Sequence, residues 1–233
     1  MKTASNATKD VGYTHTGHRQ KLRARFLKFP ETVSDTDLIE LGLMCVIPRC
    51  DVRPIAKRLL ERFHTILGIL QAPIEELIAI DGIHQTSAAF LKVCLEIALR
   101  TKKLEVIQRP ILENWENLVD YCRLNYAYKT EEELHLLVLN TEMYLMEDVL
   151  VQTGTAKVVS VPVEAIAHHA ILKHANSIIL VHNHPTGNAT PSSEDIKVTR
   201  MVRAALCPLG IDVWDSLIVG KTSVTSLRRD GLF

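Results

Sequence analysis

A short stretch in the last quarter of the chain carries two histidines, a serine and an aspartate at fixed spacing. It begins with His182-Asn183-His184-Pro185, and Ser192 and Asp195 follow after a loop-like segment. Imidazole nitrogens and carboxylate oxygens are ligands that catalytic zinc sites use, with one position left open for water. The residue types and their spacing therefore favour a zinc site that performs hydrolysis.

A strand expected just before the histidines would set their direction. Residues 177–181 form a short apolar run, which is typical of a buried strand. Side chains two positions apart on an extended chain point the same way, so His182 and His184 can reach one ion while Asn183 faces elsewhere. Pro185 and the Gly and Asn residues after it indicate that the chain then leaves the sheet.

Two interpretations are open for Ser192 and Asp195. A serine followed three residues later by an acid is a common helix start, and the apolar spacing from Ile196 to Leu206 predicts a helix there. In the first interpretation the two side chains only cap this helix. In the second, which the upstream histidines favour, one side chain binds the metal and the other donates a hydrogen bond into the site.

Hydrolysis at such a site also needs a base that accepts the proton of the attacking water. Three glutamates, residues 131–133, precede an apolar run at 134–139 where a strand is expected. Alternation along this strand places Glu132 on one face and its two neighbours on the other, and either face could point inward. Neighbouring acids are also typical of a solvated strand entrance.

At these residues the chain resembles the RadC family, whose C-terminal half carries the JAMM (MPN) metalloprotease motif. Residues 182–187 are similar to the family's HNHPSG, and residues 190–195 are similar to its TPSxxD. Residues 209–211, 217–220 and 226–231 resemble later segments of the same family. The likeness covers nearly the whole chain.

This resemblance implies a role for each candidate residue. His182, His184 and Asp195 would be the ligands of one zinc ion per chain, with water as the fourth, and Ser192 would polarise the oxygen that becomes an oxyanion. Aligning residues 139–141 with the family's L-D/N-T/S places Glu132 at the position of the general base. The implied activity is that of a zinc metallopeptidase or isopeptidase acting on an unknown protein or peptide.

Apolar spacing divides the chain into regions of different structure. Residues 1–16 lack periodicity, which predicts a disordered tail, and residues 17–104 show helical spacing interrupted by prolines, which predicts a small all-helical domain. Residues 105–110 are expected to be a linker. Residues 111–233 predict a layered α/β domain with a mixed sheet. Its expected helices are 114–124, 163–175 and one from 192, and its expected strands are 134–139, 144–152, 158–161, 177–181, 211–219 and 223–227.

Residues 75–100 resemble the helix-hairpin-helix of the family's N-terminal region, in which a Gly-Ile-Gly turn presents backbone amides to a DNA phosphate. In this chain His84 stands at the second glycine and Ser87 stands where a lysine is frequent. A side chain obstructs close approach of the backbone, and the lost lysine removes a phosphate partner, so the turn is expected to serve packing, with weak DNA binding by the domain as the alternative.

Basic residues nevertheless keep nucleic acid as an alternative partner. The densest basic cluster lies in the first helix expected and consists of Arg19, Lys21, Arg23, Arg25 and Lys28. The resemblance to the RadC family, which is associated with DNA repair, adds a second hypothesis, an accessory protein in DNA repair or recombination with an auxiliary or structural metal site. A zinc-stabilised scaffold without turnover is a third.

Composition narrows the class of protein further. The 233 residues carry no net charge, no apolar run is of membrane-spanning length, and the N-terminus is polar, so a cytoplasmic protein is expected. The five cysteines form no Cys-x-x-Cys pair, which argues against a thiolate zinc site or a disulfide framework. A zinc deaminase is disfavoured because its His-x-Glu and Pro-Cys-x-x-Cys signatures are absent.

Overall fold

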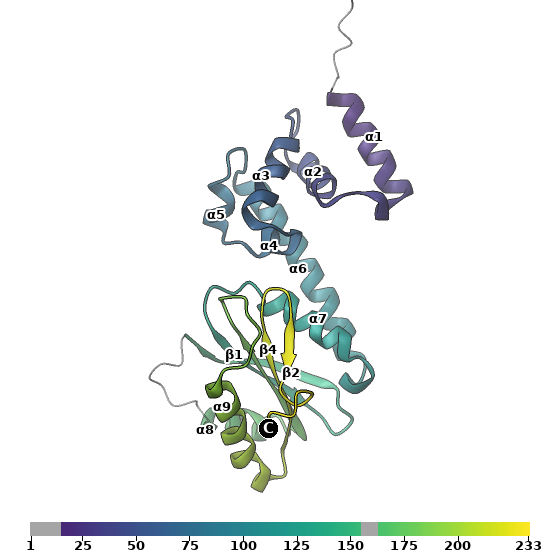
Figure 1. Ribbon diagram of the computed structural model, residues 1–233. Helices are drawn as coiled ribbons and strands as arrows, with labels where there is room; N and C mark the ends of the chain where they lie inside the picture. Colours follow the sequence, from purple (N-terminus) through teal and green to yellow (C-terminus); the bar gives the residue numbers. More distant parts are fainter. Residues whose placement is uncertain (1–14, 155–162) are drawn as a thin grey trace, which may run out of the picture. The chain divides into compact units, whose positions relative to one another are not determined.

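The computed structural model describes residues 15–154 and 163–233 (Figure 1). The chain divides into two compact units, one ending at Val93 and one beginning at Cys94, which we call the helical unit and the sheet unit. This division falls inside helix α6, Gln85–Ile107. The same helix continues into the first residues of the expected linker, 105–110. Of the expected disordered tail only residues 15 and 16 are described, and they belong to helix α1.

The helical unit is built from short helices, as the apolar spacing predicted. They are α1 (His15–Lys28), the 3₁₀ turn Pro30–Thr32, α2 (Asp35–Val46), α3 (Arg53–Phe63), α4 (Ile66–Gln71), α5 (Ile74–Ile78) and the first part of α6. Local sequence signals fix several helix starts. Ser34 and Thr65 accept backbone hydrogen bonds as N-caps, and Pro54 lies in the first turn of α3, where its missing N–H costs nothing.

The turn between α5 and α6 is closed by its own residues. Gly82 has a φ of 90°, a conformation that favours glycine. The backbone N–H of His84 donates to Oγ of Ser87 over 2.9 Å, and Ser87 is buried. His84 stands at the second glycine of the helix-hairpin-helix motif, and its backbone amide is thus already hydrogen-bonded within the protein.

The sheet unit contains a mixed five-stranded sheet in the order β2-β1-β3-β4-β5. Its strands are β1 (Glu133–Leu139), β2 (Leu145–Thr153), β3 (Ser177–Asn183), β4 (Asp212–Val219) and β5 (Val224–Ser226). Only β3 and β4 pair in parallel, and the other neighbours are antiparallel. The helices are the second part of α6, α7 (Trp115–Tyr126), α8 (Val163–Leu172) and α9 (Ser193–Leu206), with short 3₁₀ turns at Ile111–Glu113 and Cys207–Leu209.

Two apolar cores cover the two faces of this sheet. On one face α7 packs through Leu118 and Cys122 against alternate residues of β1, β3 and β4, among them Leu137. On the other face α8 and α9 pack against the remaining alternate residues, among them Leu136 and Ile178. The expected layered α/β architecture is confirmed, with α7 on one side of the sheet and α8 and α9 on the other (Figure 1).

Several expected element ends differ from the structure by one to three residues, and two of these differences have a clear structural cause. Strand β3 continues through His182 to Asn183 instead of leaving the sheet after Val181, because the backbone still pairs with β4 there. Helix α8 ends at Leu172 rather than at 175, since His174 has a φ of 50° and the chain turns back, with Ala175 N–H bonded to the Ala170 carbonyl. The strand expected at 158–161 lies outside the described residues.

Within residues 15–154 and 163–233, none of the helices combines the length and the apolarity that crossing a bilayer requires.

Candidate metal centre

Glu132, His182 and His184 converge at one end of strands β1 and β3. One ligand atom from each lies within 4.8 Å of the others, as expected of residues that share a metal ion. Oε1 of Glu132 lies 3.0 Å from Nε2 of His182. The structure thus brings together both sequence-predicted histidines and one of the three candidate glutamates.

Strand pairing determines which glutamate meets the histidines. Leu134 stands opposite His182 in the antiparallel ladder, and both share the sheet face covered by α8 and α9. Two residues before Leu134, Glu132 points to that same face, and its backbone carbonyl accepts a hydrogen bond from Gly154. Glu133 instead lies on the α7 face, where its carboxylate contacts Lys129 and His135, and Glu131 is exposed.

Asp195, on the first turn of α9, lies against both histidines. Its Oδ1 is 2.9 Å from Nδ1 of His182, and its Oδ2 is 3.4 Å from Nε2 of His184. Burial by itself raises the pKa of Asp195, but hydrogen bonds from the two histidines and from Ser192 outweigh burial and hold the pKa far below its usual range. Asp195 therefore presents a carboxylate, the form that can bind a cation.

Ser192 is the N-cap of α9, so the capping interpretation is correct in its geometry. Its Oγ accepts the backbone N–H of Asp195, while its backbone N–H donates to Oδ2 of Asp195. The hydroxyl group of Ser192 also donates to the same Oδ2 over 2.7 Å. The serine is exposed and lines a cavity of about 70 Å³ together with Glu132, His182 and Asp195. Capping and a place beside the metal cluster are thus compatible.

The second histidine is oriented by the loop that follows it. Nδ1 of His184 lies 2.8 Å from the backbone carbonyl oxygen of Asn188, which can only accept, so this nitrogen carries the hydrogen and Nε2 is left for a metal. The hydrogen bond to Asp195 raises the pKa of His184, and partial burial opposes that rise. Gly220 supports the loop, because a Cβ there would lie 2.5 Å from the Gly187 carbonyl oxygen.

The donor set fits a metal such as zinc. Asp195 lies within hydrogen-bonding range of both imidazoles and Glu132 within that range of His182, and the backbone fixes the tautomer of the His184 imidazole, as is typical of histidines that bind metal. Glu132 completes the three-residue cluster with the histidines, and Asp195 lies against both imidazoles without belonging to that set. The chemistry available to this arrangement is metal binding with a free carboxylate beside the ion.

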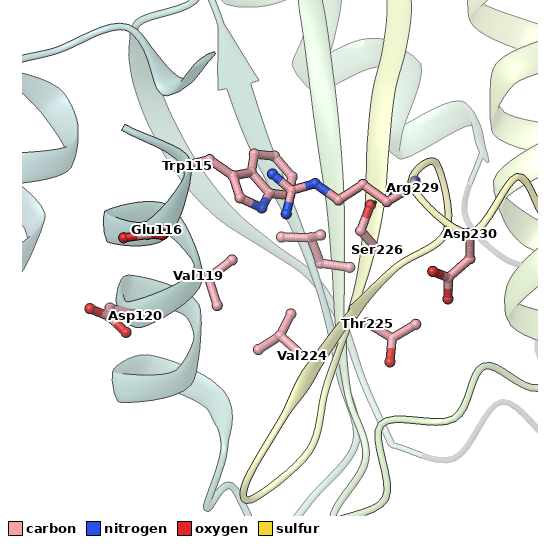
Figure 2. A pocket seen from close by; sticks show the side chains of 10 residues that line it. Trp115, Glu116, Val119, Asp120, Val224, Thr225, Ser226, Arg229 and Asp230 are labelled. Atoms are coloured by element: carbon pink, nitrogen blue, oxygen red, sulfur yellow. Dashed lines mark hydrogen bonds between the residues drawn. The ribbon is translucent and has the colours of Figure 1, made fainter. Parts of the chain in front are cut away.

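A second and larger cavity lies away from this cluster, between α7 and strands β4 and β5 (Figure 2). Its volume is about 510 Å³, and the guanidinium of Arg229 covers one face of Trp115 at 4.5 Å. The residues that line it include no histidine or cysteine. The larger cavity therefore does not compete with the histidine cluster as a metal centre.

Three features near the cluster were not found from the sequence. One is the hydrogen bond between His184 and the backbone carbonyl of Asn188. Every residue has such a carbonyl, so the residue type at position 188 does not indicate this bond. The second is the side chain of Asn183, buried on the face away from the histidines. The third is a partly buried polar network on the α7 face, in which Tyr121 and Tyr126 donate to Asp148 and His135 lies between Asp148 and Glu133. Buried polar residues within apolar alternation are the signal that could have indicated the last two.

The fold and the cluster together define an α/β domain that carries a candidate glutamate–histidine–histidine metal site. Comparison with known proteins agrees with this class. Residues 112–232 match the RadC-like JAB domain. The chain is also 36% identical over 215 residues to the UPF0758 protein SPO0054 of Ruegeria pomeroyi, a match that covers 92% of this chain and 96% of that protein. The chain therefore belongs to the UPF0758/RadC family, with the JAB/MPN domain in its C-terminal half, as its motifs predicted.

Proposed function

We propose that the protein is a zinc-dependent hydrolase of peptide or isopeptide bonds. The observation that carries this proposal is the convergence of Glu132, His182 and His184 at the end of two paired strands, with Asp195 against both histidines. Membership of a JAB-domain family supports it. Zinc is the favoured ion because it takes imidazole and carboxylate ligands and keeps a position for water.

The two carboxylates differ in their surroundings, and this difference supports a different role for each. The side chain of Asp195 is 5% exposed and contacts both histidines, which suits a metal ligand. That of Glu132 is 20% exposed, lines the cavity and contacts only His182 of the two, which suits a proton carrier. His182, His184 and Asp195 would hold the ion, and Glu132 would act beside it.

When bound, zinc supplies Lewis acidity and makes water a competent nucleophile at neutral pH. Glu132 accepts the proton of the attacking water on a carboxylate oxygen and returns it to the departing amine. Ser192 would turn its hydroxyl hydrogen from Oδ2 of Asp195 to the oxygen that gains negative charge. His184 keeps Nε2 directed at the site because its Nδ1 hydrogen is bonded to the Asn188 carbonyl.

Metal analysis combined with substitution tests this function. Purified full-length protein should contain about one zinc per chain, measured by mass spectrometry of the metal after dialysis. His182→Ala and Asp195→Ala should remove that zinc, whereas His168→Ala, an exposed histidine of α8, should leave it in place.

Turnover is the second arm of the test. Zinc-loaded wild-type protein should cleave members of a library of peptides and isopeptide-linked peptides, and chelation should stop the cleavage. Protein without stoichiometric metal, or zinc-loaded protein that cleaves none of the library, would contradict the proposal. The second outcome would leave the zinc-stabilised scaffold as the better interpretation.

A further inference from the structure

The side chain of Asn183 holds the backbone on both sides of Glu132. Its Oδ1 accepts the N–H of Glu133 over 2.7 Å, and its Nδ2 donates to the carbonyl of Glu131 over 3.0 Å. These two groups belong to the peptide units that flank Glu132. Asn183 is 2% exposed, so both bonds are shielded from competing water.

This side chain replaces a backbone partner that the sheet no longer supplies. The ladder between β1 and β3 ends at the pair Leu134 and His182, while β3 continues beside β4 as far as Asn183. The next amide, that of His184, donates to the Val219 carbonyl of β4. The β3 backbone therefore follows β4 at this point, and without Asn183 the groups around Glu132 would lose their partner on the β3 side.

The other side of the same segment is held independently. The carbonyl of Glu132 accepts a hydrogen bond from Gly154, which follows strand β2. Glu132 is thus tied to the β2 side by its own carbonyl and to the β3 side by the Asn183 amide. Since Asn183 lies between the two histidines in the chain, the same residue fixes the glutamate relative to both of them.

We propose that Asn183 is a positioning residue that sets the place of the Glu132 carboxylate opposite the histidine pair. It contacts no substrate or metal, because its side chain lies on the face away from the cluster. It acts by fixing the φ and ψ angles of Glu132 through two hydrogen bonds, and so keeps Oε1 beside Nε2 of His182. The inference rests on the proposed function only for its consequence in catalysis, since the clamp itself concerns the folded chain.

Two variants and one matched control separate positioning from general stability. Asn183→Ala removes both bonds, and Asn183→Ser keeps a polar group that is too short to span both partners. Asn140→Ala is the control, because Asn140 also bonds two backbone amides, those of Glu142 and Tyr144, at the opposite end of β1. If all three variants lost amide protection and turnover to the same extent, the cause would be lower stability of the fold and not the position of Glu132.

Amide hydrogen exchange in the full chain reads the clamp directly. Asn183→Ala should speed exchange of the Glu133 amide by about fivefold to tenfold, the equivalent of one hydrogen bond, and Asn140→Ala should not. Unchanged protection at Glu133 in a folded Asn183 variant would overturn the proposal. This measurement needs neither metal nor substrate. If Asn183→Ala does not fold, Asn183→Ser gives the same reading.

A double-mutant cycle on turnover then tests whether Asn183 acts through Glu132. With zinc-loaded protein and a peptide that the wild type cleaves, Asn183→Ala should lower turnover by roughly tenfold in the presence of Glu132, and by less than about twofold when Glu132→Gln is already present. Equal losses in both backgrounds would overturn the proposal. If the wild-type protein binds no Zn²⁺ or cleaves no peptide, the proposed function fails and the exchange experiment alone decides the role of Asn183.

Discussion

Glu132 Oε1 and His182 Nε2 lie 3.0 Å apart although the residues come from different strands, because the pairing of Leu134 with His182 brings the two chain segments together. The same contact separates Glu132 from its two acidic neighbours. Glu133 is on the opposite face and Glu131 is exposed. The register of one strand pair thus brings one of three adjacent glutamates to the histidine cluster.

We expect Glu132→Gln to keep the metal and lose the reaction. The substitution leaves His182, His184 and Asp195 in place but removes the group that carries the proton, so hydrolysis should fall by about 10²- to 10⁴-fold. The measurement is turnover of any peptide that the zinc-loaded wild type cleaves, with metal content determined on the same sample. Glu131→Gln and Glu133→Gln are the matched controls, and a comparable loss in either would argue against Glu132 as the base.

Local periodicity predicted much of this architecture. The apolar run before His182, the Ser192 and Asp195 cap, and the change from helical spacing to alternating strands are all features of neighbouring residues. Each element forms largely for reasons that its own sequence contains. For this reason the helical region, the layered α/β domain and the pairing of the two histidines could be expected before the structure was available.

The remaining features of the site depend on contacts between segments that are far apart in the sequence, and local patterns do not predict such contacts. The face of Glu132 depends on its register against β3, and the two partners of Asn183 lie on β1. The bond from His184 goes to a backbone carbonyl, so the identity of Asn188 gives no indication of it. Helix α8 ends early because His174 adopts a left-handed conformation that its residue type does not require.

Replacing Ser192 in two ways should separate its structural role from its chemical role. Ser192→Ala should lower the free energy of unfolding by about 1 kcal/mol, because Ala is a poor N-cap, whereas Ser192→Gly should cost only about a few tenths. Both variants lack the hydroxyl group, so a chemical role predicts similar losses of turnover in both. Denaturant titration and turnover measured on the same preparations give the comparison. Turnover that follows stability instead would leave Ser192 as a cap alone.

The pair of His135 and Asp148 should make stability depend on pH. Burial lowers the pKa of His135, but hydrogen bonds to Asp148 and Glu133 outweigh burial and raise the pKa above 6.5. Because the pKa of His135 is higher in the folded state than in the unfolded state, this histidine contributes fully to stability below its unfolded pKa. The contribution is lost as pH rises through its folded pKa. Wild-type stability should therefore fall as pH rises from 6.5 through the raised pKa of His135.

His135→Gln provides the comparison for this effect. It removes the titrating group, so its denaturant midpoint should change less than that of the wild type between about pH 6 and about pH 9. At the acid end Asp148 acts in the opposite direction. Burial raises its pKa, but hydrogen bonds from His135, Tyr121 and Tyr126 lower it on balance, so its contribution is lost only as pH falls through that lowered value. Parallel pH profiles for wild type and His135→Gln would refute the assignment.

Nucleic-acid contact, if the helical unit makes any, should depend on Arg23 more than on Arg19. Arg19 donates to the carbonyls of Ile47 and Cys50, which occupies its guanidinium, whereas Arg23 is exposed on α1. Duplex DNA should bind weakly, with a Kd of roughly 10⁻⁴ to 10⁻⁶ M at physiological salt, and affinity should fall steeply as salt increases. Fluorescence anisotropy of labelled duplex with the full chain measures both quantities.

The hairpin turn should contribute little to such binding, because the His84 amide is already bonded to Ser87. His84→Gly restores the glycine of the resembling motif but leaves this internal bond available, so it should not raise the affinity for DNA by more than about twofold. Arg23→Ala should weaken binding and reduce its salt dependence, since one phosphate contact is lost. A flat salt titration, or a large gain from His84→Gly, would show that α1 is not the surface that meets DNA.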